Sequence, residues 1–243
     1  EHVLHTEKMA SIGKMAAVLA HEINNPLSGI HTYAKLLTKW LDRKESGPEQ
    51  RDETRQCLDV IVSESRRCGD LVKNLLTFSR TAPMNLQKTD INQVVDRSLR
   101  LVQHQLELAG IELHLRLEEP SPVVLCDSAQ IEQALLALVL NAKDAMATSG
   151  GGVLNVATLN GELVSVRVSD TGSGIAQENI QRIYDPFFTT KTSPAEGQNR
   201  GTGLGLSVTY GIIQEHAGNI RVESRPGEGT TFTLDFPLIS AST

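Results

Sequence analysis

The residues near the start of the chain that are best suited to chemistry are His21, its neighbour Glu22, and Asn25 one helical turn later. They lie in a segment whose apolar residues recur every three or four positions, which indicates one apolar helix face. At about 100° per residue, His21 points roughly 165° from the centre of that stripe, so we expect the imidazole to face solvent. A neutral imidazole is a nucleophile near neutral pH, and Glu22 can fix its tautomer or take its proton. An ordinary surface histidine is the alternative.

Two glycine-rich segments later in the chain suit a nucleotide. Asp170-Thr171-Gly172-Ser173-Gly174 follows an expected strand, so a ligand can approach the backbone and Asp170 can accept from an exocyclic amine such as that of adenine. Gly201-Thr202-Gly203-Leu204-Gly205 runs into an expected helix, whose first N–H groups suit phosphate. An ordinary turn is the alternative for the first segment. Neither segment has the dinucleotide or P-loop spacing, so both of those folds are disfavoured.

A polar pair and a long irregular segment complete the candidate site. Asn141 and Asp144 interrupt an Ala- and Leu-rich helical run, where such groups seldom lack a partner. An amide oxygen suits Mg²⁺ together with phosphates and water, whereas residues that cap or line a loop are the alternative. Residues 185–200 have no clear period, and we interpret them as a lid over a nucleotide. Its cations, Lys191 and Arg200, either meet phosphate or stay solvated.

Two long amphipathic helices are expected at the start of the chain, over residues 8–41 and 52–80, with a polar turn over residues 42–51 between them that contains Gly47-Pro48. Such a hairpin buries too little surface to be stable alone. We therefore expect two copies of the chain to form a dimeric four-helix bundle. Packing of the hairpin on the downstream domain is the alternative.

The pattern changes at Pro83, because proline disfavours helix before it, and we predict domains at 1–82 and 83–243. In the second domain, Asp90 with Gln93 predicts a capped helix start, and Asn160-Gly161 predicts a hairpin turn. The order of elements predicts an α+β layer of helices against a mixed sheet. The expected strands are 84–89, 111–117, 123–125, 153–158, 163–168, 220–224 and 230–236, and the expected helices are 90–108, 128–146, 177–184 and 204–216.

Composition narrows the partners and the compartment. The formal net charge of −6 and the lack of a basic stripe interleaved with aromatics argue against nucleic acid. Three scattered cysteines fit neither a metal site nor a disulfide framework, which favours a reducing, cytoplasmic setting. No run has the length of a membrane span and no signal peptide opens the chain, so we expect membrane attachment only through an upstream segment.

The combination resembles a sensor histidine kinase of two-component signalling, over nearly the whole chain. Five motifs occur in family order: His21-Glu22-Ile23-Asn24-Asn25-Pro26-Leu27 (H-box), Asn141-Ala142-Lys143-Asp144-Ala145-Met146 (N-box), Asp170 to Gly174 (first G-box), Asp185-Pro186-Phe187-Phe188-Thr189-Thr190-Lys191 (F-box) and Gly201 to Gly205 (second G-box). The sequences DPFFTTK and HEINNP are most similar to those of the nitrogen-regulation-like branch.

This resemblance implies a dimerisation and phosphoacceptor hairpin followed by an α/β sandwich that binds ATP, the Bergerat-type fold, over about residues 84–240. It implies ATP and Mg²⁺ as cofactors, a homodimer, and transfer of the phosphoryl group to an aspartate of a response-regulator receiver domain. Dephosphorylation of that regulator is a further implied activity.

The resemblance also implies roles for individual residues. His21 would be the phosphoacceptor, Glu22 a general base or orienting group, and Asn25 would position water when the partner is dephosphorylated. Asn141 would hold Mg²⁺ and Asp170 would read adenine. The other residues implied to contact ATP are Asp144, Gly172, Gly174, Lys191, Gly201, Thr202, Gly203, Leu204 and Gly205.

One position departs from the family pattern. The N-box often has a second Asn four residues before Asn141, where this chain has Ala137, so the metal would have one protein ligand fewer. Related gyrase and mismatch-repair ATPases carry a water-activating Glu there, so Ala137 counts against water as the acceptor. Three functions stay open in this order: a protein-histidine kinase, a nucleotide-binding dimer scaffold without catalysis, and an ATP hydrolase.

Overall fold

The computed structural model describes residues 20, 23–41, 48–79, 84–190 and 203–238. The chain divides into two compact units, Glu1–Ala82 and Pro83–Thr243. Among the residues just given, no helix is both long enough and apolar enough to cross a membrane.

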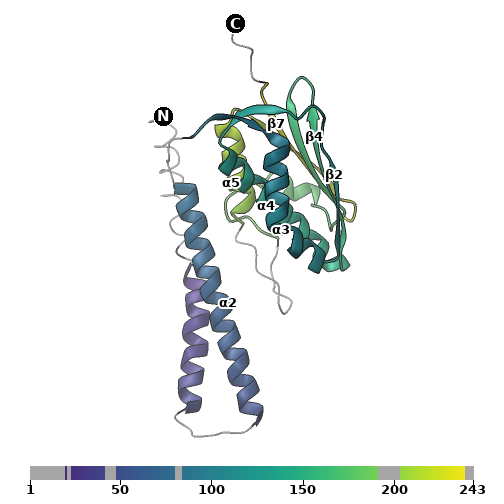
Figure 1. Cartoon of the computed structure of the whole chain (residues 1–243). Helices are drawn as coiled ribbons and strands as arrows, with labels where there is room; N and C mark the ends of the chain where they lie inside the picture. Colours follow the sequence, from purple (N-terminus) through teal and green to yellow (C-terminus); the bar gives the residue numbers. More distant parts are fainter. Residues whose placement is uncertain (1–19, 21–22, 42–47, 80–83, 191–202, 239–243) are drawn as a thin grey trace. The chain divides into compact units, whose positions relative to one another are not determined.

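The first unit is a helical hairpin (Figure 1), in which residues 23–41 form one helix and α2 spans Pro48–Ser79. α2 begins before the predicted residue 52. Proline suits the first turn of a helix, because the N–H group that it lacks would have no intrahelical partner there. The predicted polar turn is therefore shorter than the sequence pattern indicated.

The face that packs within the hairpin combines residues of both helices. Pro26 and Cys57 are buried, and a Cβ built on Gly29 would lie 3.5 Å from Glu64 Cγ on the opposite helix. Leu27 is 48% exposed, so its side of the helix is not covered within the hairpin. Two apolar faces on one helix follow the same three-four spacing, so periodicity does not say which of them packs within one chain.

The second unit is a two-layer α+β domain (Figure 1), as predicted. Its main sheet has the strand order β2-β4-β5-β7-β6, with β2 parallel to β4 and the other neighbours antiparallel. β1 and β3 form a separate antiparallel pair. The strands are β1 Gln87–Asp90, β2 Ile111–Arg116, β3 Val123–Cys126, β4 Gly152–Asn160, β5 Val164–Asp170, β6 Asn219–Arg225 and β7 Gly229–Phe236. The α-helices are α3 Ile91–Leu108, α4 Ser128–Met146 and α5 Gly205–Glu215, and the 3₁₀ turns are η1 Ala147–Ser149 and η2 Gln177–Asn179.

Local signals account for several element boundaries. The Asp90 side chain accepts from Gln93 N at 3.1 Å and from Gln93 Nε2 at 3.2 Å, which confirms the predicted cap of α3. The turn at Asn160-Gly161 joins β4 to β5 as predicted, with Gly161 N donating to Leu163 O at 3.1 Å.

The predicted helix at 177–184 was wrong, because only the 3₁₀ turn η2 forms there. Gln177, Glu178 and Gln181 are exposed in this stretch and Ile183 alone is buried. A longer helix would therefore bury little apolar surface, and most helical stability in proteins comes from such burial.

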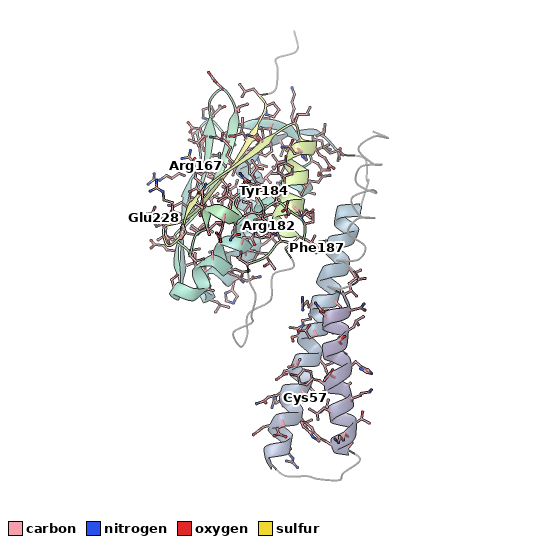
Figure 2. The ribbon with its side chains drawn as sticks, turned by 180° about the vertical axis from the view of Figure 1, so that it is seen from behind. Cys57, Arg167, Arg182, Tyr184, Phe187 and Glu228 are labelled. Carbon is pink, nitrogen blue, oxygen red and sulfur yellow. The ribbon has the colours of Figure 1, made fainter. Side chains whose placement is uncertain are left out.

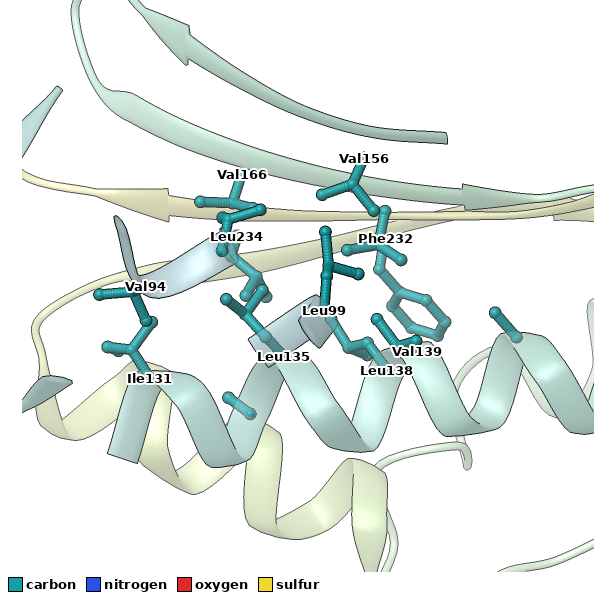
Figure 3. Packing of buried hydrophobic residues seen from close by; sticks show 14 of the residues in the cluster. Val94, Leu99, Ile131, Leu135, Leu138, Val139, Val156, Val166, Phe232 and Leu234 are labelled. Atoms are coloured by element: carbon teal, nitrogen blue, oxygen red, sulfur yellow. The ribbon is translucent and has the colours of Figure 1, made fainter. Parts of the chain in front are cut away.

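The core fills the space between one face of the main sheet and the helices α3 and α4 (Figure 3). α4 packs against α3 on one side and against α5 on the other. The sheet and two helices thus fix the position of α4. The core residues labelled in the figure are Val94, Leu99, Ile131, Leu135, Leu138, Val139, Val156, Val166, Phe232 and Leu234.

Candidate functional site

Asp170 lies on the helix side of the main sheet, at the end of β5. Side chains alternate along a strand, and Asp170 continues the buried series of Val166 and Val168. Its Oδ1 accepts from Gly172 N at 2.8 Å, and the backbone N–H of Thr230 also donates to the carboxylate. Burial raises the pKa of Asp170, and these two hydrogen bonds offset only part of that effect. The structure therefore provides a buried acceptor in a fixed orientation.

One side of α4 faces both glycine segments. Ala137, Asn141 and Ala145 recur every four residues and so share one side of the helix. A Cβ built on Gly205 would lie 3.8 Å from Ala137 Cβ and 3.9 Å from Asn141 Nδ2. A Cβ built on Gly172 would lie only 2.8 Å from Ala145 Cβ. Asn141 thus stands between the start of α5 and the loop after β5.

The loop after β5 is joined directly to the end of α4. Ser173 N donates to Ala145 O at 3.0 Å, and no side chain fits on Gly172 because the Ala145 backbone is too close. Ala145 was not among the predicted site residues. Small residues at spacing four around Asn141 are the signal in the sequence that would have identified this contact.

The N-terminus of α5 offers backbone donors beside Asn141. The cap residue is Leu204, whose side chain carries no polar group, and no side chain caps the first turn. The first N–H groups of an α-helix have no intrahelical partner, and together with the helix dipole they favour an anion. The arrangement combines a helix end that suits an anion with an amide side chain.

The segment around Phe187, which Figure 2 labels, is hydrogen-bonded to Gly203 of the second glycine segment. Phe187 N donates to Gly203 O at 2.9 Å, and a Cβ on Gly203, which has φ +67°, would lie 2.7 Å from Phe187 Cα. Gly203 is therefore required by its neighbour as well as by its own backbone conformation. Tyr184 packs on Tyr210 of α5 with ring centroids 5.2 Å apart, which holds the same segment on that helix.

The remaining predicted residues are not brought into this arrangement. Asp144 is exposed, about 60° around α4 from Asn141 at ~100° per residue. Asn25 is half-buried in the first unit, beside Pro26. His21, Glu22, Lys191, Gly201 and Thr202 lie outside the described residues, as does Arg200.

Two protein families match the chain. The His Kinase A phospho-acceptor domain matches residues 11–83, and the histidine kinase-, DNA gyrase B- and HSP90-like ATPase family matches residues 126–240. The second match identifies the second unit as an ATP-binding domain of that ATPase type.

Named relatives agree with both matches. The sensor histidine kinase ZraS of Escherichia coli K12 is 36% identical over 233 residues, which make up 96% of this chain and 47% of the relative. The signal transduction histidine-protein kinase AtoS of the same strain is 32% identical over 232 residues, 96% of this chain and 36% of the relative. The chain thus spans less than half the length of these two relatives.

Solved structures share the fold. The catalytic domain of the histidine kinase ThkA is 29% identical with a TM-score of 0.55, and the match covers 63% of this chain and 96% of that one. ThkA in complex with the response regulator TrrA matches at 24% identity and a TM-score of 0.75, over 98% of this chain and 65% of that one. The nitrogen-regulation-like branch stays a prediction. Since the two family matches cover most of the sequence in the order phosphoacceptor then ATPase, the chain belongs to the sensor histidine kinases of two-component signalling.

Proposed function

We propose that this chain binds ATP, phosphorylates itself on His21, and passes the phosphoryl group to an aspartate of a response-regulator receiver domain. The observation that carries the proposal is the buried Asp170 acceptor at one end of the α4 side that also holds Asn141 and the α5 N-terminus. A purine acceptor and a phosphate site thereby fall within one domain. The ThkA neighbour, solved with a response regulator, supports the choice of partner. We expect the reaction in the cytoplasm, where ATP and receiver domains are found.

Each group of site residues takes one part of ATP in this proposal. Asp170 accepts from the exocyclic amine of adenine, and the loop containing Gly172 and Gly174 allows the base close to the backbone. The phosphates lie at the N-terminus of α5, where the donors are backbone N–H groups. The residues proposed for the phosphate end are Lys191, Gly201, Thr202, Gly203, Leu204 and Gly205.

Asn141 is the residue that would hold Mg²⁺. An amide oxygen is a hard ligand of the kind that Mg²⁺ accepts beside phosphate oxygens and water, and Asn141 lies next to the phosphate-binding helix end. Bound Mg²⁺ would neutralise phosphate charge. Ala137, on the same side of α4, contributes no second amide.

The transfer step needs placement more than covalent help from the protein. A neutral ring nitrogen of His21 attacks the γ-phosphorus, a P–N bond forms, and the P–O bond to ADP breaks with its electron pair on ADP. Glu22 orients the ring or takes the proton of the other nitrogen. The receiver aspartate then attacks the same phosphorus and releases the imidazole. When the chain instead dephosphorylates the regulator, Asn25 positions the water that removes the phosphoryl group.

We also propose that the hairpin dimerises, so that two copies form a four-helix bundle. Large apolar side chains remain exposed on both described helices, outside the face that packs within the hairpin. A second copy is the economical way to cover them, because a two-helix unit buries little surface alone. These side chains are Leu27, Leu41, Leu58, Val62 and Val72.

Replacing the phosphoacceptor gives the direct test of the kinase. With γ-labelled ATP, wild-type chain should acquire acid-labile label, and His21→Gln should lose it because glutamine offers no nucleophilic ring nitrogen. His31→Gln is the matched control, since His31 is exposed on the helix of residues 23–41, ten positions after His21 in the sequence, and should keep full labelling. Label that persists in His21→Gln would refute His21 as sole acceptor. ATP binding without any transfer would favour the scaffold, and phosphate release without labelling would favour the hydrolase.

Protonation of Asp170 at low pH should weaken ATP binding and stabilise the folded chain. Protonation removes the acceptor, and since burial raises this pKa above its ordinary 3.8, ATP affinity should fall at a higher pH than for an exposed carboxyl. The folded state then binds the proton more tightly than the unfolded chain, so this group adds stability as pH falls through the raised pKa. Titration calorimetry measures the ATP affinity and urea unfolding measures the stability, each as a function of pH on wild type and Asp170→Asn. Identical pH profiles in the two proteins would contradict this prediction.

A charge on the exposed apolar face of the hairpin should separate the dimer. Leu58→Glu would bury a carboxylate without a partner, so the dissociation constant should rise by about 100-fold or more. Leu108→Glu is the control, because Leu108 is exposed on α3 in the other unit. Sedimentation velocity measures the oligomeric state of both variants. A Leu58→Glu chain that stays dimeric at micromolar concentration would exclude this face as the interface.

A further inference from the structure

Ser224 lies in a row of residues that crosses three strands at the end of the main sheet. The strand register pairs Ser224 of β6 with Thr230 of β7, and Thr230 with Asp170 of β5. Ser224 follows Ile220 and Val222 on the helix side of β6, so it shares the face that carries the Asp170 carboxylate. The row thus ends at the proposed purine acceptor.

The hydroxyl of Ser224 makes three hydrogen bonds. It accepts from Ile175 N at 2.8 Å, donates to Gly229 O at 2.8 Å, and lies 3.0 Å from Thr230 Oγ1. A serine hydroxyl can donate only one hydrogen bond, and Ser224 donates it to Gly229 O. The Thr230 hydroxyl must therefore donate to Ser224 Oγ. Ser224 then uses its one donor and both lone pairs.

These three partners belong to the two segments that hold Asp170. Ile175 ends the loop whose Gly172 N–H donates to the carboxylate, and Thr230 provides the second N–H donor at the start of β7. The Ser224 side chain ties the loop to β7. A shift of either segment would turn the acceptor away from a ligand.

The turn between β6 and β7, marked by Glu228 in Figure 2, closes against the same loop. Gly227 N donates to Ser173 O at 2.8 Å. Gly174 has φ +69°, and a Cβ there would collide with the carbonyl oxygen of Arg225. Gly174 is therefore required by the turn, whatever the ligand requires. The loop is braced by α4 at Ser173 N and by this turn at Ser173 O.

We propose that Ser224 is a positioning residue for nucleotide recognition, which holds the loop after β5 and the start of β7 so that Asp170 presents its carboxylate to adenine. The inference rests on the proposed function, because it needs Asp170 to bind the base. Ser224 itself does not touch ATP. It acts through the two backbone donors of Asp170.

A double-mutant cycle tests this role in the full chain, with ATP as the probe in titration calorimetry. Ser224→Ala removes all three hydrogen bonds and should weaken ATP binding by about 5- to 10-fold. In the Asp170→Asn background the same change should cost less than about 2-fold, because the acceptor that it positions is already gone. Equal losses in both backgrounds would show a general structural role and overturn the inference.

Two further variants separate the outcomes. Ser169→Ala is the matched control, because Ser169 of β5 pairs with Thr231 Oγ1 of β7 at 2.8 Å, next to Asp170 and Thr230 but on the opposite sheet face, and ATP affinity should stay within about 2-fold. Ser224→Cys keeps the volume with weak hydrogen bonds and should lie between alanine and wild type, which keeps the test decisive if Ser224→Ala does not fold. If Asp170→Asn alone leaves ATP affinity unchanged, the proposed function fails. If Asp170→Asn weakens binding and both Ser224 variants do not, only the role of Ser224 fails.

Discussion

Burial of the Asp170 carboxylate is the constraint on which the second unit depends. A carboxylate taken out of water costs several kcal/mol unless donors replace its hydration. Here the donors are backbone N–H groups of Gly172 and Thr230, so the loop after β5 and the β5–β7 register must both be held. Because burial still raises the pKa, these donors do not fully replace water. A ligand amine would supply part of what is missing, so the same feature that costs stability favours adenine.

α4 turns this local constraint into a site. One face of α4 packs into the core. Its other face carries Asn141, with the small residues Ala137 one turn before it and Ala145 one turn after it. Small side chains allow the loop after β5 and the start of α5 to approach the same helix closely. A site carried by packed helices and strands holds its groups in place better than one carried by loops alone. Phe187, at φ 66° beside Gly203, is the one described non-glycine residue of the site with a left-handed backbone, and such strain is common where a ligand is bound.

Local chemistry was enough to predict the cap at Asp90, the turn at Asn160-Gly161 and the motifs of the site, because each depends on residues close in sequence. The contacts of Ala145 and Ser224 were not predicted, because strand register and helix packing bring together residues far apart in the chain. The period of the first helix predicts an apolar face but does not say what covers it. Leu27 is exposed within one chain, and a helix in a bundle can have more than one apolar face.

The central claim is that adenine is read through its exocyclic amine by Asp170, so that the γ-phosphoryl group is held for His21. The most direct test compares ATP with inosine triphosphate, which carries a carbonyl oxygen where adenine has its amine, as phosphoryl donors to the full chain. A carboxylate acceptor facing that oxygen would repel it, so kcat/KM for labelling of His21 should be at least about 100-fold lower with inosine triphosphate than with ATP. Asp170→Asn should lose most of this discrimination between the two nucleotides. Equal labelling of the wild-type chain by the two nucleotides would contradict the account.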